Sequence, residues 1–489
     1  MARAPPARSC TPHGMERASL SNTTDVCRPW SASAAPPTTT TPRRDCAMEH
    51  DRNLATLIDE VQKLKLSRRS ALGRAAALGL GAAAIAAHLP SATRRASGQA
   101  KPQVRLSTWA GVDEAAELQV VVDRVNQAAT TFEIVSEPNP ADYYTRLQTT
   151  ISGGNAADLF WLSQEYVAGY ADRGALLDVT DRLSGDVGPA ANLADYYPSA
   201  LQTAQYGDRT WGLPWISQPV ILYYNPALFE AAGVAPPDDT WTWDIFRQAA
   251  VQLTDPAAGV YGTSFNDWPP LQMFIWQAGG EVISEDLTSC PIDSPEAIAG
   301  AQFYADIIYN QEVAVPAATI SEQGFGEMVK AGKVAMFYGG AGDDLDYASK
   351  KDPANAVLRT ALVPQGPANR QTFSYVASTV ISASTENPDA AAQALAALTE
   401  GIHHWKIVAP RQSLANVDTI IASVPDKAES ADVILRALPD ARALRIIPQQ
   451  QEWDTIFFEE FKDPLYQKEA SAEELAPDAR ASLEDLLPS

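Results

Sequence analysis

The chain has 489 residues, which is long enough for two or three globular domains with their own cores. Its first hundred residues hold 14 basic and 7 acidic side chains, so residues 101–489 keep 23 basic against 53 acidic ones, a formal charge of −30. A body this acidic repels phosphate backbones and anionic lipid headgroups, which disfavours nucleic-acid binding and membrane-surface binding, and its charge otherwise serves solubility.

The N-terminal segment 1–47 is rich in Pro, Thr, Ser and Ala and shows no apolar periodicity. Such a composition cannot bury enough apolar surface to offset the entropy lost on ordering, so we expect a disordered extension. The alternative is that translation starts at Met48, where an amphipathic pattern begins, and that the first 47 residues are not part of the protein.

Residues 48–100 have the pattern of an export signal. Arg68 and Arg69 precede a weakly apolar run of Ala, Gly and Leu over 75–89, which is too short to span a bilayer well, and small residues follow it. The segment resembles a twin-arginine (Tat) signal peptide without a lipoprotein cysteine. The resemblance implies that the Tat machinery exports the folded protein to the periplasm or cell surface. A buried Ala-rich helix with a chance arginine pair is the alternative.

Strands and helices alternate at the start of the mature body. The apolar periodicity predicts strands over 104–109, 132–135 and 158–162 and helices over 113–129 and 143–151. This alternation indicates an α/β fold with an open sheet and helices packed on its faces. Ligands of such sheets bind beyond the carboxyl ends of the strands, where Trp109, Gln164 and Glu165 are expected.

A second unit begins near 212–215. The pattern predicts strands over 221–225, 260–265 and 334–338, and helices over 243–253 and from 295 to 310. Ser294 can cap the last of these helices, Pro295 suits its first position, and Glu296 complements its dipole. The stretch 241–244, Trp-Thr-Trp-Asp, opens the helix over 243–253, and we expect both tryptophans to pack in a core.

The last third of the body continues with a glycine-rich loop, strands over 373–384, a helix over 388–399 and further helices. The loop at 339–344, Gly-Gly-Ala-Gly-Asp-Asp, lacks the Gly-Lys-Ser/Thr ending that a phosphate-binding loop needs. Glycine and proline punctuate 212–219 and 364–367, which are candidate crossings between two lobes.

Cysteine and histidine are scarce in the body. Cys290 is its single cysteine, so residues 101–489 have neither an intrachain disulfide nor a Cys-type zinc site. His403 and His404 are adjacent, and neighbouring residues on a helix point about 100° apart, which makes a poor chelate. We therefore expect no metal, no cofactor and no enzyme that relies on a histidine base.

The order of motifs in the body resembles family 1 extracellular solute-binding proteins, the carbohydrate receptors of bacterial ABC importers. The strongest stretch is Tyr-Tyr-Asn-Pro-Ala-Leu-Phe-Glu-Ala-Ala-Gly-Val at 223–234, followed by Pro-Pro and Thr-Trp-Asp. Other stretches in the family's order lie at 142–160, 212–215, 279–280, 293–304, 332–337, 363–367 and 386–398. Two departures are Ala157 before Asp158, where the family usually has proline, and the loop 339–344, where it often has a glycine followed by an aromatic residue.

The resemblance covers roughly residues 102–489 and implies a two-lobe α/β fold of the periplasmic binding protein type, with hinge crossings and a cleft. The implied parts are 101–214 and 365–445 for lobe 1, and 215–364 and the C-terminal helices 446–489 for lobe 2. It also implies a binding protein that captures a sugar or oligosaccharide between the lobes and delivers it to the transmembrane subunits of an ABC permease.

A sugar ring has an apolar face and a belt of hydroxyls, so its site needs flat aromatic side chains beside polar ones. A place in a core is the alternative for each tryptophan, and a place on the surface for each polar residue. The candidate ligand-binding residues are Trp109, Trp161, Gln164, Glu165, Trp215, Asn266, Trp268, Trp276, Tyr338, Asp343, Tyr375, Arg411 and Trp453.

Two other functions stay open at this point. A receptor for a phosphorylated polyol or another non-sugar solute would need several Lys or Arg residues in the cleft, and Arg411 is the one that the motif positions supply. A secreted carbohydrate hydrolase would need a carboxylate pair set across the bond, and no local motif nominates such a pair.

Overall fold

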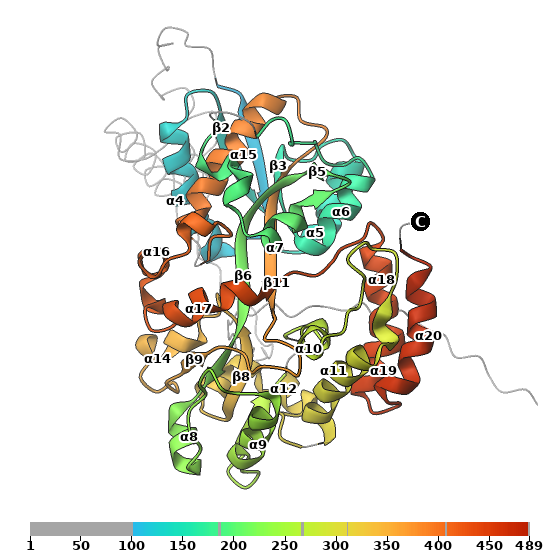
Figure 1. The fold of residues 1–489 in the computed structure, drawn as a ribbon. Coiled ribbons are helices and arrows are strands. Elements are labelled where there is room, and N and C mark those ends of the chain that lie inside the picture. Colours follow the sequence, from blue (N-terminus) through green and yellow to red (C-terminus); the bar gives the residue numbers. More distant parts are fainter. Residues whose placement is uncertain (1–100, 184–186, 266–267, 311, 406–407, 488–489) are drawn as a thin grey trace, which may run out of the picture. The chain divides into compact units, whose positions relative to one another are not determined.

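The structure, a computed structural model, describes residues 101–183, 187–265, 268–310, 312–405 and 408–487 (Figure 1). The N-terminal extension and the Tat-like segment, residues 1–100, lie outside the described residues. The described residues all fall within one compact unit. Within the described residues, no helix combines the length and the apolar character that crossing a membrane requires.

The first lobe alternates strands and helices as predicted. Its elements are β1 (Gln103–Thr108), α4 (Val112–Ala128), β2 (Glu133–Pro138), α5 (Tyr143–Ser152), β3 (Leu159–Ser163) and α6 (Gln164–Asp172). β1 pairs in parallel with β2 on one side and β3 on the other. The apolar stripe of α4, which includes Leu118 and Val122, is buried in the core of this lobe together with Leu395 and Leu398 of α15 (Pro388–His403).

Two long strands cross from the first lobe into the second (Figure 1). β6 (Gly212–Tyr224) pairs antiparallel with β10 (Thr372–Ile381) along its first half, and with β8 (Val334–Gly340) and β9 (Arg359–Ala361) along its second half. The main sheet has the order β2-β1-β3-β10-β6-β8-β7, and β11 (Ala441–Arg442) pairs with β10. The predicted strand at 221–225 is therefore the second half of a crossing strand.

The second lobe begins with two capped helices. Asn225 caps α8 (Pro226–Ala232), and the Thr242 hydroxyl accepts the Ile245 N–H at the start of α9 (Trp243–Leu253). β7 (Tyr261–Ser264), α10 (Gln272–Ala278) and α11 (Pro295–Ala305) follow. The Ser294 side chain accepts the N–H of Ala297 and Pro295 occupies the first turn of α11, so the predicted helix start is confirmed.

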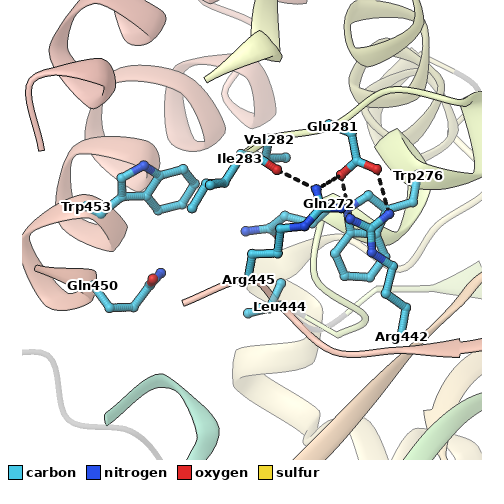
Figure 2. A pocket seen from close by; sticks show the side chains of 10 residues that line it. All are labelled: Gln272, Trp276, Glu281, Val282, Ile283, Arg442, Leu444, Arg445, Gln450 and Trp453. Carbon is cyan, nitrogen blue, oxygen red and sulfur yellow. Dashed lines mark hydrogen bonds and ion pairs between the residues drawn. The ribbon is translucent and has the colours of Figure 1, made fainter. Parts of the chain in front are cut away.

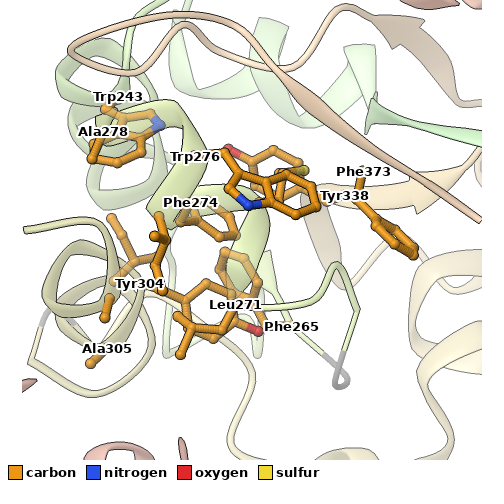
Figure 3. Close-up of a cluster of buried hydrophobic side chains, with 14 of the residues drawn as sticks. Trp243, Phe265, Leu271, Phe274, Trp276, Ala278, Tyr304, Ala305, Tyr338 and Phe373 are labelled. Carbon is orange, nitrogen blue, oxygen red and sulfur yellow. The ribbon is translucent and has the colours of Figure 1, made fainter. Parts of the chain in front are cut away.

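A large aromatic cluster forms the core of the second lobe (Figure 3). Trp243 stacks on Phe303 at 3.9 Å between ring centroids and 10° between planes, and its indole N–H donates to Gln277 Oε1 at 2.7 Å. Trp241 is also buried in this cluster and lies 6.0 Å from the Phe229 ring. The prediction that both tryptophans pack in a core is confirmed.

The second half of β6 is buried on both faces. Successive side chains of a strand point to opposite sides, so those of β6 enter two different clusters. Val220 and Leu222 join the aromatic cluster, whereas Ile221 and Tyr223 join a separate cluster with α16 (Val417–Ser423) and α17 (Ala431–Ala437). The lobe boundaries predicted from the sequence stay predictions, and the packing differs from them here: α16 and α17 fall within 365–445 but lie against strands of the second lobe.

The remaining elements are short or lie at the C-terminus. They are α7 (Pro198–Leu201), β4 (Gln205–Tyr206), β5 (Arg209–Thr210), α12 (Ala317–Gln323), α13 (Phe325–Lys330), α14 (Ala348–Lys351), α18 (Gln450–Ile456), α19 (Asp463–Tyr466) and α20 (Ala472–Glu484). α18 and α20 bury Trp453 and Leu483 in the aromatic cluster of the second lobe, and the segment that follows α18 buries Phe457 there.

Candidate functional site

Strand ends from both lobes converge on the middle of the crossing strands. β1 and β3 run in parallel, and β3 ends with Ser163 opposite Ala377 of β10. From the other side, β7 and β8 run in parallel, and β8 ends with Gly340 opposite Val220 of β6. Open α/β sheets bind ligands beyond the carboxyl ends of their strands. The middle of β6 and β10 thus lies between two sets of such ends.

Gln218 is a polar side chain at the centre of β6. It is half-buried in a strand whose neighbouring residues are buried, and it lies opposite Tyr375 of β10. Its amide packs against the end of β8 and the loop that follows. A Cβ on Gly340 would lie 2.1 Å from Gln218 Nε2, and a Cβ on Gly342 would lie 2.8 Å from Gln218 Oε1. Gln218 is not among the ligand residues predicted from the sequence, although a glutamine inside an apolar strand was an available signal.

The first lobe contributes a group of aromatic rings. The Trp109 centroid lies 5.2 Å from that of Trp161 and 6.1 Å from that of Trp215, and the last two rings are 4.4 Å apart. Tyr144 stacks on Tyr166 at 3.9 Å. Trp109 and the two tyrosines are half-buried, whereas Trp161 and Trp215 are at most 3% exposed. The rings of Trp109, Tyr144 and Tyr166 therefore offer surface to a ligand, and the buried Trp161 and Trp215 support them.

Polar groups lie beside these rings at the end of β3. Ser163 Oγ donates to Glu165 Oε2 at 2.5 Å, and the Ser163 N–H donates to the Tyr144 hydroxyl at 3.1 Å. Burial, with a smaller contribution from the Glu165 carboxylate, raises the pKa of both Tyr144 and Tyr375. Both phenols therefore stay protonated at neutral pH and can donate hydrogen bonds.

Buried polar atoms without a hydrogen-bond partner occur on both sides of the crossing strands. Such atoms are uncommon in folded proteins and call for a water or a ligand. Within the described part of the chain they include Thr108 Oγ1, Trp161 Nε1, Gln164 Oε1, Trp215 Nε1 and Trp268 Nε1.

The second lobe contributes Trp268 and Asp343. Trp268 is half-buried and packs edge-on against Phe373 at 5.1 Å. Asp343 follows the end of β8 and its carboxylate lies beside Tyr223: a Cβ on Gly339 would lie 2.6 Å from Asp343 Oδ2 and 2.8 Å from Tyr223 Cε2. Burial raises the pKa of Asp343 to about 6, against the opposing effect of Lys427. Asn266, another predicted ligand residue, lies outside the described residues.

A separate pocket joins Trp276 and Trp453 (Figure 2). The guanidinium of Arg442 lies over the Trp276 ring at 4.4 Å from its centroid. Arg442 and Arg445 both donate to Glu281, at distances of 2.5 to 2.8 Å. The Trp453 side chain itself is 1% exposed. The pocket therefore combines an aromatic ring with two arginines that share one carboxylate.

Two other predicted ligand residues lie away from the strand ends. Tyr338 points into the core of the second lobe, where it packs against Phe246 and Phe274, because its position in β8 faces the aromatic cluster. Arg411 is buried between two acids, with Nε 2.8 Å from Asp195 Oδ2 and Nη1 2.5 Å from Glu400 Oε2.

Histidine and cysteine take structural positions. His403 is buried with Nε2 3.0 Å from the Pro214 carbonyl oxygen, and burial lowers the pKa of its imidazole to about 3. Burial raises the pKa of Cys290 to about 12, so its thiol stays protonated. Within the described ranges, no group of three or more His, Cys, Asp and Glu side chains is arranged to hold a metal ion.

Comparisons with known proteins agree with this architecture. The chain is 23% identical over 313 residues, 63% of its own length and 74% of the relative's, to a binding protein of Brucella abortus. It superposes on an ABC substrate-binding protein of Listeria monocytogenes in complex with cycloalternan with a TM-score of 0.67 and 21% identity, covering 79% of this chain and 98% of the other. It also superposes on the cyclic α-maltosyl-1,6-maltose binding protein of Arthrobacter globiformis, with a TM-score of 0.66 and 19% identity, covering 79% of this chain and 99% of the other.

These superpositions show the two-lobe fold of periplasmic binding proteins. The family described as bacterial extracellular solute-binding protein matches residues 110–400, which is more than half of the chain and includes β3, β6, β8 and most of α15. The chain therefore belongs to the bacterial extracellular solute-binding protein family.

Proposed function

We propose that the protein captures a sugar or oligosaccharide along the middle of β6 and β10 and delivers it to an ABC permease. The observation that carries the proposal is the convergence of strand ends from both lobes on Gln218 and Tyr375, with half-buried rings of Trp109 and Trp268 from opposite lobes. Aromatic faces match the apolar side of a sugar ring, and the amide, phenol and carboxylate groups match its hydroxyls. The cycloalternan complex of the Listeria neighbour and the name of the Arthrobacter neighbour, a cyclic α-maltosyl-1,6-maltose binding protein, support this ligand class.

Binding without turnover is part of the proposal. Glu165 follows the end of β3 and Asp343 follows the end of β8. A reducing-sugar assay on the bound ligand separates this function from the hydrolase alternative, because turnover would release new reducing ends.

Thermal-shift screening over a panel of mono- and oligosaccharides identifies the ligand. A ligand at 100 times its Kd stabilises the folded state by about 2.7 kcal/mol, which gives a clear rise in Tm. A panel that produces no shift, together with calorimetry that shows no binding, would contradict the proposed function.

Removal of the Trp109 ring is expected to weaken sugar binding by about 1–3 kcal/mol, because the ring offers apolar surface to the ligand. Titration calorimetry of Trp109→Ala against the best ligand measures the effect. Gln218→Leu is expected to weaken binding by a similar amount, because the variant loses a hydrogen bond to the ligand. Phe458→Ala removes an aromatic ring that is 38% exposed elsewhere and serves as the matched control. Unchanged affinity in both site variants would place the ligand elsewhere.

Export through the Tat machinery, with release to the periplasm or cell surface, is proposed from residues 48–100. Changing Arg68 and Arg69 to lysine is expected to block export of a fused reporter, since the Tat route depends on the arginine pair. The same reporter with the unchanged signal is the control, and equal export of both would exclude the Tat assignment.

A receptor for a phosphorylated polyol is the second candidate. Arg442 and Arg445 line the pocket beside Trp276, and arginine is suited to bidentate phosphate recognition. Glu281 already accepts hydrogen bonds from both guanidinium groups, which favours the neutral sugar. Glycerol phosphates in the same thermal-shift panel distinguish the two ligand classes.

A further inference from the structure

Lys427 is a lysine whose side chain is 1% exposed. Lysine is almost never fully buried unless it is paired. The Lys427 ammonium donates to Asp346 Oδ1 at 2.8 Å, to the Tyr223 hydroxyl at 3.4 Å and to the carbonyl oxygen of Asp343. These three partners match its three donors.

The partners of Lys427 tie three segments together. Tyr223 belongs to β6, and its hydroxyl donates to the Gly340 carbonyl oxygen at 2.8 Å. Asp346 follows the loop after β8, and its second oxygen accepts from Ser430 Oγ at 2.5 Å. The segment that carries Lys427 and Ser430 is therefore fixed both to the crossing strand and to the loop.

The same loop lies against the candidate site on its other side. Gly340 and Gly342 pack against the Gln218 amide, whereas the Asp343 carboxylate lies beside the Tyr223 ring on the other face, where a Cβ on Gly339 would meet both. Gln218 and Tyr223 have opposite parity along β6, so their side chains lie on opposite faces of the strand. Lys427 thus holds the loop from the face that carries Tyr223, away from the face that carries Gln218.

We propose that Lys427 is a positioning residue that fixes the loop 339–344 so that the glycines beside Gln218 are held ready for the ligand. The inference rests on the proposed function for the identity of the site. Lys427 does not touch the ligand itself, because its donors are taken by Asp343, Asp346 and Tyr223. Its effect on binding passes through the main chain of Asp343.

The charge pattern around the loop limits which variants can fold. Asp343, Asp344 and Asp346 lie close together, and Lys427 is the buried cation among them, while Lys351 pairs with Asp344 on the surface at 3.3 Å. Tyr223 and Tyr347 also face the cluster. Without Lys427 these carboxylates would lie close together without a buried cation.

The test uses a charge-neutral double variant. Lys427→Met alone leaves Asp346 buried without its cation and is expected to compromise folding. The combination of Lys427→Met with Asp346→Asn removes both charges and keeps the side-chain volumes. Arg480→Met with Asp293→Asn, a pair 3.0 Å apart that joins α20 to the turn before α11, is the matched control.

The expected result for the full-length double variant is a native circular dichroism spectrum, faster amide hydrogen exchange over 339–344 without ligand, and at least about tenfold weaker binding of the best sugar. The control pair is expected to leave affinity within about twofold.

Wild-type exchange in the loop together with wild-type affinity would overturn the role of Lys427. Faster exchange with unchanged affinity would also overturn it, because the loop would then be irrelevant to binding. A wild-type protein that binds no sugar refutes the proposed function instead. In that case the exchange measurement still decides whether Lys427 orders the loop.

Discussion

Replacing Trp243 with alanine is expected to lower the free energy of unfolding by about 3–5 kcal/mol, the largest stability loss that we predict for a single residue. The indole stacks on Phe303 and lies 6.1 Å from the Phe274 ring, so its removal leaves a cavity in an aromatic core. It also takes away the donor that satisfies Gln277 Oε1, a side chain that is fully buried. Urea unfolding followed by circular dichroism measures the loss.

Two further variants separate these contributions. Trp243→Phe keeps a ring beside Phe303 but loses the N–H, and we expect a smaller loss of about 1–3 kcal/mol. Val251→Ala, on the same helix at a side chain that is 50% exposed, is expected to change stability by less than about 0.5 kcal/mol. Similar effects of all three substitutions would contradict the packing described for α9.

Arg411→Ala is expected to destabilise the protein by about 3 kcal/mol at neutral pH without weakening sugar binding. Arg411 is 7% exposed and bridges Asp195 and Glu400, so its removal leaves two partly buried carboxylates without a cation. Arg436→Ala is the matched control, because Arg436 also contacts two acids but is 40% exposed, and we expect less than about 1 kcal/mol. A large loss of sugar affinity with unchanged stability would instead restore Arg411 as a ligand residue.

The effect of Arg411→Ala should shrink in acid. Burial opposes the ionised form of Asp195, but hydrogen bonds from Ser413 and Arg411 outweigh it and lower the pKa of the carboxyl. A carboxyl with a lowered folded-state pKa contributes stability above its unfolded pKa of about 3.9 and loses it as the pH falls through the folded value. Unfolding free energies measured near neutral pH and at about pH 3 check this direction, since the difference between wild type and variant should be smaller in acid.

Most of the fold could be predicted from the sequence, because local signals and packing agree. The strands of the first lobe alternate with an amphipathic helix such as α4, and Ser294 with Pro295 marks the start of α11 as expected. The motif order pointed to the family that also matches 110–400. The position of α16 and α17 could not be predicted, because an amphipathic helix shows that it has an apolar face but not which strand it covers.

The candidate site was predictable only in part. The ends of the strands could be located from the sequence, so Trp109, Glu165 and Asp343 were correctly predicted to lie near strand ends. Whether a tryptophan there offers surface or supports a neighbour depends on pairing register, so Trp161 and Trp215 could not be distinguished from Trp109. Gln218 was missed because its role depends on a contact with glycines more than a hundred residues away.

The central claim is that a carbohydrate binds between the two sets of strand ends. The most direct measurement is a crystal structure of the protein with the sugar that stabilises it most. We predict that the sugar lies along the middle of β6, with one face on Trp109 and hydroxyls bound to Gln218 and Tyr375. A sugar confined to the pocket of Trp276 and Arg442, or bound on the outer surface of either lobe with Gln218 uncontacted, would contradict the claim.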